Sequence, residues 1–436
     1  MYYQIPVLFL GILFLVILKQ NKHDLLCPQN VVCGLYCAMA VSSIFLVDEY
    51  GSSFTKATIL PSILGFSLML VVTLLPCFVI RKPKQNVNYR SEFKCMHSKS
   101  GQVVLLVLAC LGIYGFSYLL PPAIKSLSLS AFVARELQES NLLVSSPYLT
   151  VAAIPATFFA LYGLILFSPV RKQCGVFVKI GLAAGFGSYA LNNMCNKGRD
   201  WLIQYLLILI LYYWLFGTEW SRRFKRVIIL MSGSLLLFGL LLVAQSTVER
   251  FGLEGTGVGI AQGTIGYLGQ QVYMFVETVE MEDFTSEWPK VMFPLAYKLV
   301  GEEPVEVKEY LGKRTMLHQY SFGTFLATLY PVVGWNGLII FAVCFLGVFW
   351  TGFLGLYRRE KYIAYSILLL LYFQFMTQGV FYWMMYGRSG NVYALGMACV
   401  IVALAVRKRK NLKYSGMSSM NDAEMEKTGC KLKPAG

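Results

Sequence analysis

The fold is decided by stretches such as residues 336–357, NGLIIFAVCFLGVFWTGFLGLY, which contain no charged side chain. A helix that crosses a bilayer needs about 20 mostly apolar residues, so this stretch is long enough. The basic turn 358–361 (RREK) follows it, and a second apolar run, 362–385, begins directly afterwards. The pattern predicts consecutive membrane-spanning helices that are joined by short charged turns.

Similar runs recur along the chain, which is 56% apolar and 14% charged with a mean hydropathy of +0.58. This composition excludes a set of soluble domains. We predict an all-α polytopic membrane protein with about eleven transmembrane helices. The run 3–18 has no basic residue before it and no cleavage site, which favours a retained first helix over a signal peptide. The predicted spans are 3–18, 30–47, 57–80, 103–120, 150–167, 174–195, 201–217, 227–246, 336–357, 362–385 and 392–406.

The spans divide the chain into four parts. We expect N-terminal transmembrane helices in 1–246, one large extracytoplasmic loop in 247–321, and C-terminal transmembrane helices in 322–406. Residues 407–436 are polar, lysine-rich and without apolar periodicity, which predicts a disordered cytoplasmic tail. The loop 247–321 contains eleven acidic and six basic residues, although the whole chain has a net charge of +15.

Basic residues predict the orientation, because short cytoplasmic loops carry an excess of lysine and arginine. The loop 81–102 holds six basic residues and one acidic residue. We therefore predict a multi-pass protein of the cytoplasmic membrane, with its N-terminus and 247–321 outside and its C-terminus inside. The positive charge then faces anionic lipid headgroups, and it does not call for nucleic acid. Four further basic segments fall on the same side as 81–102: 171–172, 222–226, 358–361 and 407–410.

Motifs exclude several kinds of chemistry. The sequence has no P-loop, no GxSxG elbow and no HExxH pair, so ATP hydrolysis and serine or zinc chemistry are unsupported. Cys33 and Cys37 lie one helical turn apart, but the second ligand pair of a zinc site is missing. The large loop contains no cysteine, so no disulfide framework is implied. We expect neither a metal nor a cofactor.

The first candidate site is the outer turn 192–201, NNMCNKGRDW. Lys197 and Arg199 can hold a pyrophosphate, because the planar fork of arginine matches phosphate oxygens. Gly198 lets a bulky headgroup approach the backbone. The alternative is that both cations extend to the membrane interface and that Asp200 neutralises one of them.

Two more candidates lie within the large loop. Arg250 precedes the glycine-rich segment 252–269, which either wraps a ligand or is a flexible exit from the membrane. His318 is the side chain best suited to move protons near neutral pH, and Lys313 and Arg314 lie within about a turn of it. A surface or helix-capping residue is the alternative for His318.

The loop also shows helix-like apolar spacing in 267–281 and 288–300. Its aromatic side chains stand beside carboxylates, which suits sugar rings, although an amphipathic helix at the membrane interface would look the same. Arg388, between the last two spans, joins the candidate substrate-binding residues. The aromatic candidates for substrate binding are Tyr267, Tyr273, Trp288 and Tyr320.

Two segments resemble landmarks of a known family. Residues 195–207 (CNKGRDWLIQYLL) and 322–337 (FGTFLATLYPVVGWNG), the latter followed by an apolar helix, resemble segments of bacterial oligosaccharide repeat-unit polymerases. These are the Wzy-type O-antigen and capsule polymerases. The layout of 1–406, with ten or more spans and one large outer loop, is also similar to that of the O-antigen ligases of the same broad superfamily.

The resemblance implies a GT-C-like fold and glycosyl transfer at the outer leaflet. The donor would be a growing glycan on undecaprenyl pyrophosphate, and the acceptor one lipid-linked repeat unit, without a nucleotide sugar or metal. Flippase and chain-length regulator proteins are the implied partners. Arg199, Arg250 and Lys197 would clamp the pyrophosphate, and His318 or a loop carboxylate would be the base.

Two other classes remain open. A transporter or lipid-linked oligosaccharide flippase would show repeat symmetry, broken helices and ionisable groups at mid-membrane, where Lys179 is the clearest basic candidate. An O-acetyltransferase would favour a histidine deep in a helix, and the sequence has none there.

Overall fold

The computed structural model describes residues 2–47, 56–83, 98–127, 148–195, 200–230, 232–234, 237, 257–280, 290, 294–302, 324–381 and 387–406. Within these residues all regular structure is helical, as predicted. In chain order the helices are α1 (Gln4–Gln20), α2 (Pro28–Ile44), α4 (Lys56–Leu74), η1 (Leu75–Val79), α6 (Lys99–Leu127), α8 (Tyr148–Thr157), α9 (Phe159–Phe167), η3 (Pro169–Gln173), α10 (Val176–Cys195), α11 (Asp200–Phe216), η4 (Gly217–Glu219), α13 (Gly257–Glu280), α15 (Pro294–Leu299), α17 (Phe325–Arg358), α18 (Tyr362–Gly379) and α19 (Gly387–Val406).

The predicted spans coincide with helices. Of the span 227–246, the described residues 227–230, 232–234 and 237 are also helical. Among the described residues, four helices are long and apolar enough to cross a membrane: Thr58–Val79, Lys99–Ser126, Trp201–Glu219 and Phe325–Arg358. The segments Gln4–Gln20 and Gly390–Val406 are shorter apolar helices. Eleven crossings and a GT-C-like fold stay predictions.

Long apolar surfaces point outward on two of these helices. A folded protein in water seldom exposes a large continuous apolar patch, whereas lipid is a matching solvent for one. These surfaces support a membrane-embedded protein. On α6 the exposed residues include Val103, Val104, Leu106 and Val107, and on α17 they include Ile339, Ile340, Val343 and Val348.

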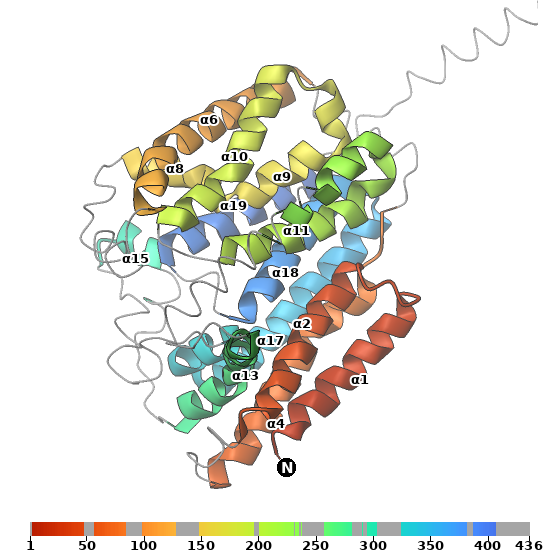
Figure 1. Cartoon of the computed structure of the whole chain (residues 1–436), viewed down its shortest axis with the longest axis vertical. Coiled ribbons are helices and arrows are strands. Elements are labelled where there is room, and N and C mark those ends of the chain that lie inside the picture. Colours follow the sequence, from red (N-terminus) through yellow and green to blue (C-terminus); the bar gives the residue numbers. More distant parts are fainter. Residues whose placement is uncertain are drawn as a thin grey trace, which may run out of the picture.

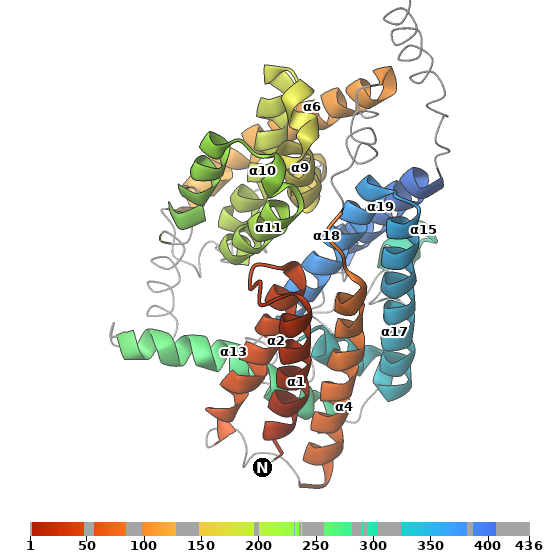
Figure 2. The same ribbon diagram turned by 90° about the vertical axis from the view of Figure 1, so that its right-hand side faces the viewer.

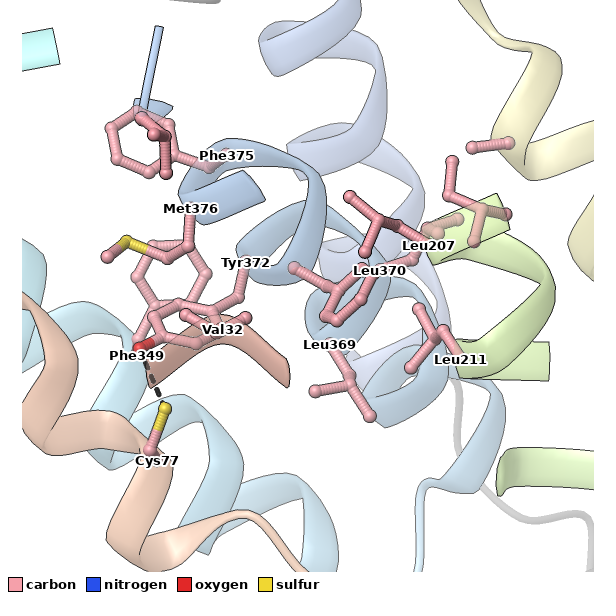
Figure 3. Packing of buried hydrophobic residues seen from close by; sticks show 14 of the residues in the cluster. Val32, Cys77, Leu207, Leu211, Phe349, Leu369, Leu370, Tyr372, Phe375 and Met376 are labelled. Atoms are coloured by element: carbon pink, nitrogen blue, oxygen red, sulfur yellow. Dashed lines mark hydrogen bonds between the residues drawn. The ribbon is translucent and has the colours of Figure 1, made fainter. Parts of the chain in front are cut away.

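Helix α18 is the centre of the bundle. Every residue from Tyr362 to Gly379 is buried except the half-buried Leu371. The helix packs against α2, α9, α11, α17 and α19. Figure 3 shows Leu369 and Leu370 directed toward α11, while Tyr372 faces the opposite side, where its hydroxyl lies 3.4 Å from the Cys77 sulfur.

Two helix groups flank α18 (Figure 1). One contains α1, α2, α4 and α17, and the other contains α6, α8, α9 and α10. In the second group α6 and α10 are in very close contact, because a Cβ on Gly181 would lie 2.4 Å from the Cα of Ala109. Small residues allow such backbone approach between membrane helices.

One predicted span contains a break, and a second break lies just before another predicted span. The span 150–167 is divided at Phe158, which has φ −98° and ψ 17° between α8 and α9. Helix α17 is interrupted at Gly334, whose φ of 63° and ψ of −172° are open essentially to glycine alone. The break allows Trp335 to lie against Gly65 of α4, where a Cβ would come within 2.3 Å of the indole.

The described basic turns meet at one end of the bundle, which we call the basic end. The backbone N–H of Arg81 donates to the Tyr365 hydroxyl, which in turn donates to the Arg81 carbonyl, at 2.8 Å each. This joins the end of η1 to the start of α18, next to 358–361. Lys82 lies 5.9 Å from the Trp214 ring of α11. The distribution of lysine and arginine in the sequence had predicted that these turns lie on the same side of the membrane.

Helix α13 lies at the opposite end, which we call the α13 end. It runs across α1, α2 and α4 rather than along them (Figure 2). It packs against α2, α4 and α17. The helix predicted at 267–281 is therefore confirmed up to Glu280, and it is longer on its N-terminal side. Of the helix predicted at 288–300, the structure shows α15.

Candidate functional site

Most of the predicted site residues fall outside the part of the chain that the structure describes. Their assigned roles therefore stay predictions. For Arg388 the structure describes the backbone alone, in the first turn of α19. The residues outside the described ranges are Lys197, Arg199, Arg250, Trp288, Lys313, Arg314, His318 and Tyr320.

Two of the helices that follow these segments, α11 and α17, each contact α18. In the sequence, the segment with Lys197 and Arg199 directly precedes α11, and the described part of the second landmark, 324–337, forms the start of α17. Phe325 of α17 packs on Phe375 of α18, with ring centroids 5.3 Å apart. The two landmark segments, far apart in sequence, therefore contact the same end of the same helix.

Buried polar side chains hold this arrangement together, and we call them the amide cluster: Gln204, Gln374, Thr377, Gln378 and Tyr393. Thr377 of α18 donates to the side-chain oxygen of Gln204 on α11 at 3.5 Å, a weak hydrogen bond. The Tyr393 hydroxyl of α19 donates to the side-chain oxygen of Gln374. Three helix ends are thereby connected by uncharged groups.

The cluster lies close to the α13 end of the helices. Gln204 is in the second turn of α11, and Tyr393 is about 9 Å along α19 from Gly387. The Nε2 atom of Gln374 is buried and has no hydrogen-bond partner among the described residues. A buried donor without a partner costs about 1–3 kcal/mol, so such groups are retained for structural specificity or function.

Sequence reasoning did not select this cluster, except that Gln204 fell inside the first landmark. A signal was present in QFMTQ, residues 374–378. Gln374, Thr377 and Gln378 share one helix face because they are three and four residues apart. Amides are costly inside an apolar span, so this face indicates contact with other helices rather than lipid.

The start of α17 also holds α13 in place. Phe275 of α13 meets Tyr330 and Trp335 edge to face, with ring centroids 5.7 Å and 5.8 Å apart. Tyr330 and Trp335 lie on either side of the break at Gly334. The second landmark therefore connects α18 to the part of 247–321 that the structure describes.

Tyr267 and Tyr273, two predicted substrate-binding residues, are both on α13. The ring of Tyr267 stacks on Phe381, just beyond α18, at 5.3 Å, and it is 37% exposed. Tyr273 is buried, and its hydroxyl donates to the Ser43 carbonyl of α2 at 2.7 Å. Its ring lies 4.6 Å from that of Tyr3. Tyr273 thus packs α13 on the bundle, while Tyr267 keeps an exposed face near the end of α18.

Two carboxylates lie at the far end of α13. Glu280 accepts a hydrogen bond of 2.5 Å from the Thr58 hydroxyl of α4. Glu277, one turn earlier, is half-buried, and its Oε2 atom has no hydrogen-bond partner among the described residues. Burial, and then the charge of Glu280, raises the pKa of Glu277 from 4.5 to about 7. Along α13 this carboxyl is about 15 Å from Tyr267, so it is not part of the amide cluster.

Within the described ranges no group of three or more His, Cys, Asp or Glu side chains could hold a metal ion. Comparison with protein-family models, with curated proteins and with solved structures finds no match for this chain.

Proposed function

We propose that the chain is a glycosyltransferase that polymerises undecaprenyl-pyrophosphate-linked oligosaccharide repeat units at the outer leaflet of the cytoplasmic membrane. The product would be a surface polysaccharide such as an O-antigen, a capsule or an exopolysaccharide. The α13 end would face outward and the basic end inward. One observation supports the proposal above others: both landmark segments contact the same end of α18, through Thr377–Gln204 and Phe325–Phe375.

The reaction in this proposal is a glycosyl transfer, in which a glycan moves from one lipid carrier to another. A hydroxyl of the acceptor attacks the anomeric carbon of the donor, a new C–O bond forms, and the bond to undecaprenyl pyrophosphate breaks. The leaving pyrophosphate takes the electron pair, so nearby cations stabilise it. Arg199, Arg250 and Lys197 have this role in our proposal, and a base takes the proton of the hydroxyl.

The amide cluster fits a positioning role in this scheme. Gln204 is five residues after Arg199, and Tyr393 is five residues after Arg388, so their hydrogen bonds to α18 fix the starts of α11 and α19. Because a displacement of about 1 Å can slow a positioned reaction substantially, the cluster would act on the rate without touching the reacting atoms.

The base stays a choice between His318 and a loop carboxylate. Glu277 has a pKa suited to proton transfer near neutral pH. Its distance from the amide cluster argues against it if the acceptor binds at the end of α18. Loss of activity in His318→Gln with retention in Glu277→Gln would assign the base to His318, and the reverse result would assign it to Glu277.

A flippase or transporter is the second candidate, because the breaks at Phe158 and Gly334 and the buried amides are features of transporter helices. The position of Lys179 does not support a transporter, because this lysine is near the end of its span rather than in the middle. Lys179 lies in the first turn of α10, where its N–H bonds to the Gly175 carbonyl, near the basic turn 171–172. A ligase-type transfer is the third, since it uses the same donor with another acceptor.

Deletion of the gene, followed by analysis of surface glycan length, distinguishes the three. Glycans that stop at one repeat unit support the polymerase. Loss of lipid-linked units from the outer face indicates a flippase, and long lipid-linked chains that reach no final acceptor indicate a ligase.

Restoring the gene with Arg199→Ala or Arg250→Ala should leave the protein in the membrane and reduce lengthening more than tenfold, because each variant loses a charge-assisted contact of about 2 kcal/mol. Normal lengthening by both variants would return these arginines to a role at the membrane interface.

A further inference from the structure

A dense group of cations lies at the basic end, on one side of the bundle. It comes from three parts of the fold: the η3 turn, the first turn of α10 and the helical residues 222–230. We call it the basic patch, and it consists of Arg171, Lys172, Lys179, Arg222, Arg223, Lys225 and Arg226.

Contacts fix the parts of this patch against one another. The guanidinium of Arg171 lies 3.6 Å from the centre of the Phe224 ring, which places η3 on the helix 222–230. The Trp220 indole donates to the Phe167 carbonyl at 2.9 Å, which joins the residues just before 222–230 to the end of α9. Stacking on Phe224 orients the flat face of Arg171 and leaves the N–H groups on its edge to bind elsewhere.

Few acidic residues belong to this part of the chain. Between residues 168 and 230 the acidic residues are Asp200, at the opposite end of α11, and Glu219. In the described part of the chain, no ion pair involves a side chain of the basic patch. A group of like charges repels itself unless counter-charge binds, so the patch favours an anionic partner.

The surface next to the patch is apolar and exposed. On α10, Val176 is 72% exposed, and on the other side Leu230 is 69% exposed. Along the sequence, both sets of apolar residues lie within two helical turns of the cations. The remaining exposed members are Phe177, Ile180, Val227 and Ile229.

We propose that the basic patch is a binding site for an anionic glycerophospholipid of the surrounding membrane. The phosphate lies among Arg171, Lys172 and Arg222, and the acyl chains lie along the exposed apolar residues of α10 and 222–230. Cations next to exposed apolar side chains match the headgroup and the acyl chains of a lipid, whereas a soluble anion or an acidic protein has no acyl chains. The inference does not depend on the proposed glycosyl transfer.

The test uses the full chain, purified in a neutral detergent and titrated with dioleoyl phosphatidylglycerol, and native mass spectrometry measures the bound lipid. Phosphatidylcholine, which has the same phosphate but no net charge, should bind far more weakly. The triple variant Arg171→Gln, Lys172→Gln, Arg222→Gln should lose affinity for phosphatidylglycerol, by about fivefold for each cation removed. Excess inorganic phosphate should not displace the lipid.

A matched control removes the same charge from another basic turn of the same end: Arg358→Gln, Arg359→Gln, Lys361→Gln. Equal loss of lipid in both triple variants would overturn the proposal, since the effect would then be general charge. Equal binding of phosphatidylcholine, or displacement by inorganic phosphate, would overturn it too. If the triple variant at the site does not fold, phosphatidylglycerol binding to the natural chain is measured with added salt. Weaker binding at higher salt supports the proposal, and binding that does not change with salt refutes it.

Discussion

We predict that Glu277 makes the docking of α13 depend on pH and that one substitution removes this dependence. The carboxyl is half-buried beside Glu280, and its pKa is raised from 4.5 to about 7. The docked helix therefore binds a proton more tightly than the undocked helix does. The resulting stabilisation is fully present below about pH 4.5, decreases as the pH rises, and is lost above about pH 7.

The size of the effect follows from the pKa. A shift from 4.5 to about 7 corresponds to about 3 kcal/mol if the carboxyl were fully shielded. Because Glu277 is partly exposed, solvent screening reduces this to about 1–2 kcal/mol. The equilibrium between docked and undocked α13 should then change by roughly tenfold between about pH 5 and about pH 8.

Amide hydrogen exchange of α13, corrected for the intrinsic pH dependence of exchange, measures this equilibrium. In the natural chain the protection of residues 265–280 should fall by roughly tenfold over that range. Glu277→Gln should keep the protection nearly constant, because the amide stays uncharged at every pH. Glu302→Gln is the control, since that carboxylate is exposed, is not on α13, and forms an ion pair with Lys290, with the Nζ and Oε2 atoms 3.0 Å apart. The reasoning fails if Glu277→Gln shows the same pH dependence as the natural chain.

Three further predictions concern topology, packing and positioning. In a cysteine-free background, an impermeant thiol reagent applied to intact cells should label Thr285→Cys and not Ser98→Cys, and the opposite pattern would reverse the orientation. Gly181→Leu should prevent α6 and α10 from packing and lower the amount of folded protein in detergent, whereas Gly11→Ala, where a Cβ meets nothing within 4 Å, should not; equal yields would contradict the close contact. Gln374→Leu leaves the tyrosine hydroxyl bonded to it without an acceptor, so glycan lengthening should slow by roughly tenfold at unchanged substrate affinity, and a change confined to affinity would argue against positioning.

The sequence determined the helices and their grouping by charge. A run such as 336–357 forms a helix in lipid because its backbone groups have no water to bind, and the apolar run is visible without any partner. The basic turns 81–82 and 358–361 were assigned to one side by the same local reading, and the structure places them together. The helical spacing of 267–281 likewise depended on its own residues alone.

The tertiary structure alone decided which helix is central and which polar groups meet. The apolar runs 336–357 and 362–385 look alike in sequence, yet α18 is buried on all sides and α17 exposes Ile340 and Val343. Hydropathy cannot separate them, because lipid and a neighbouring helix are equally apolar. The contact between Gln204 and Thr377, and the raised pKa of Glu277, depend on segments distant in the chain that only folding brings together.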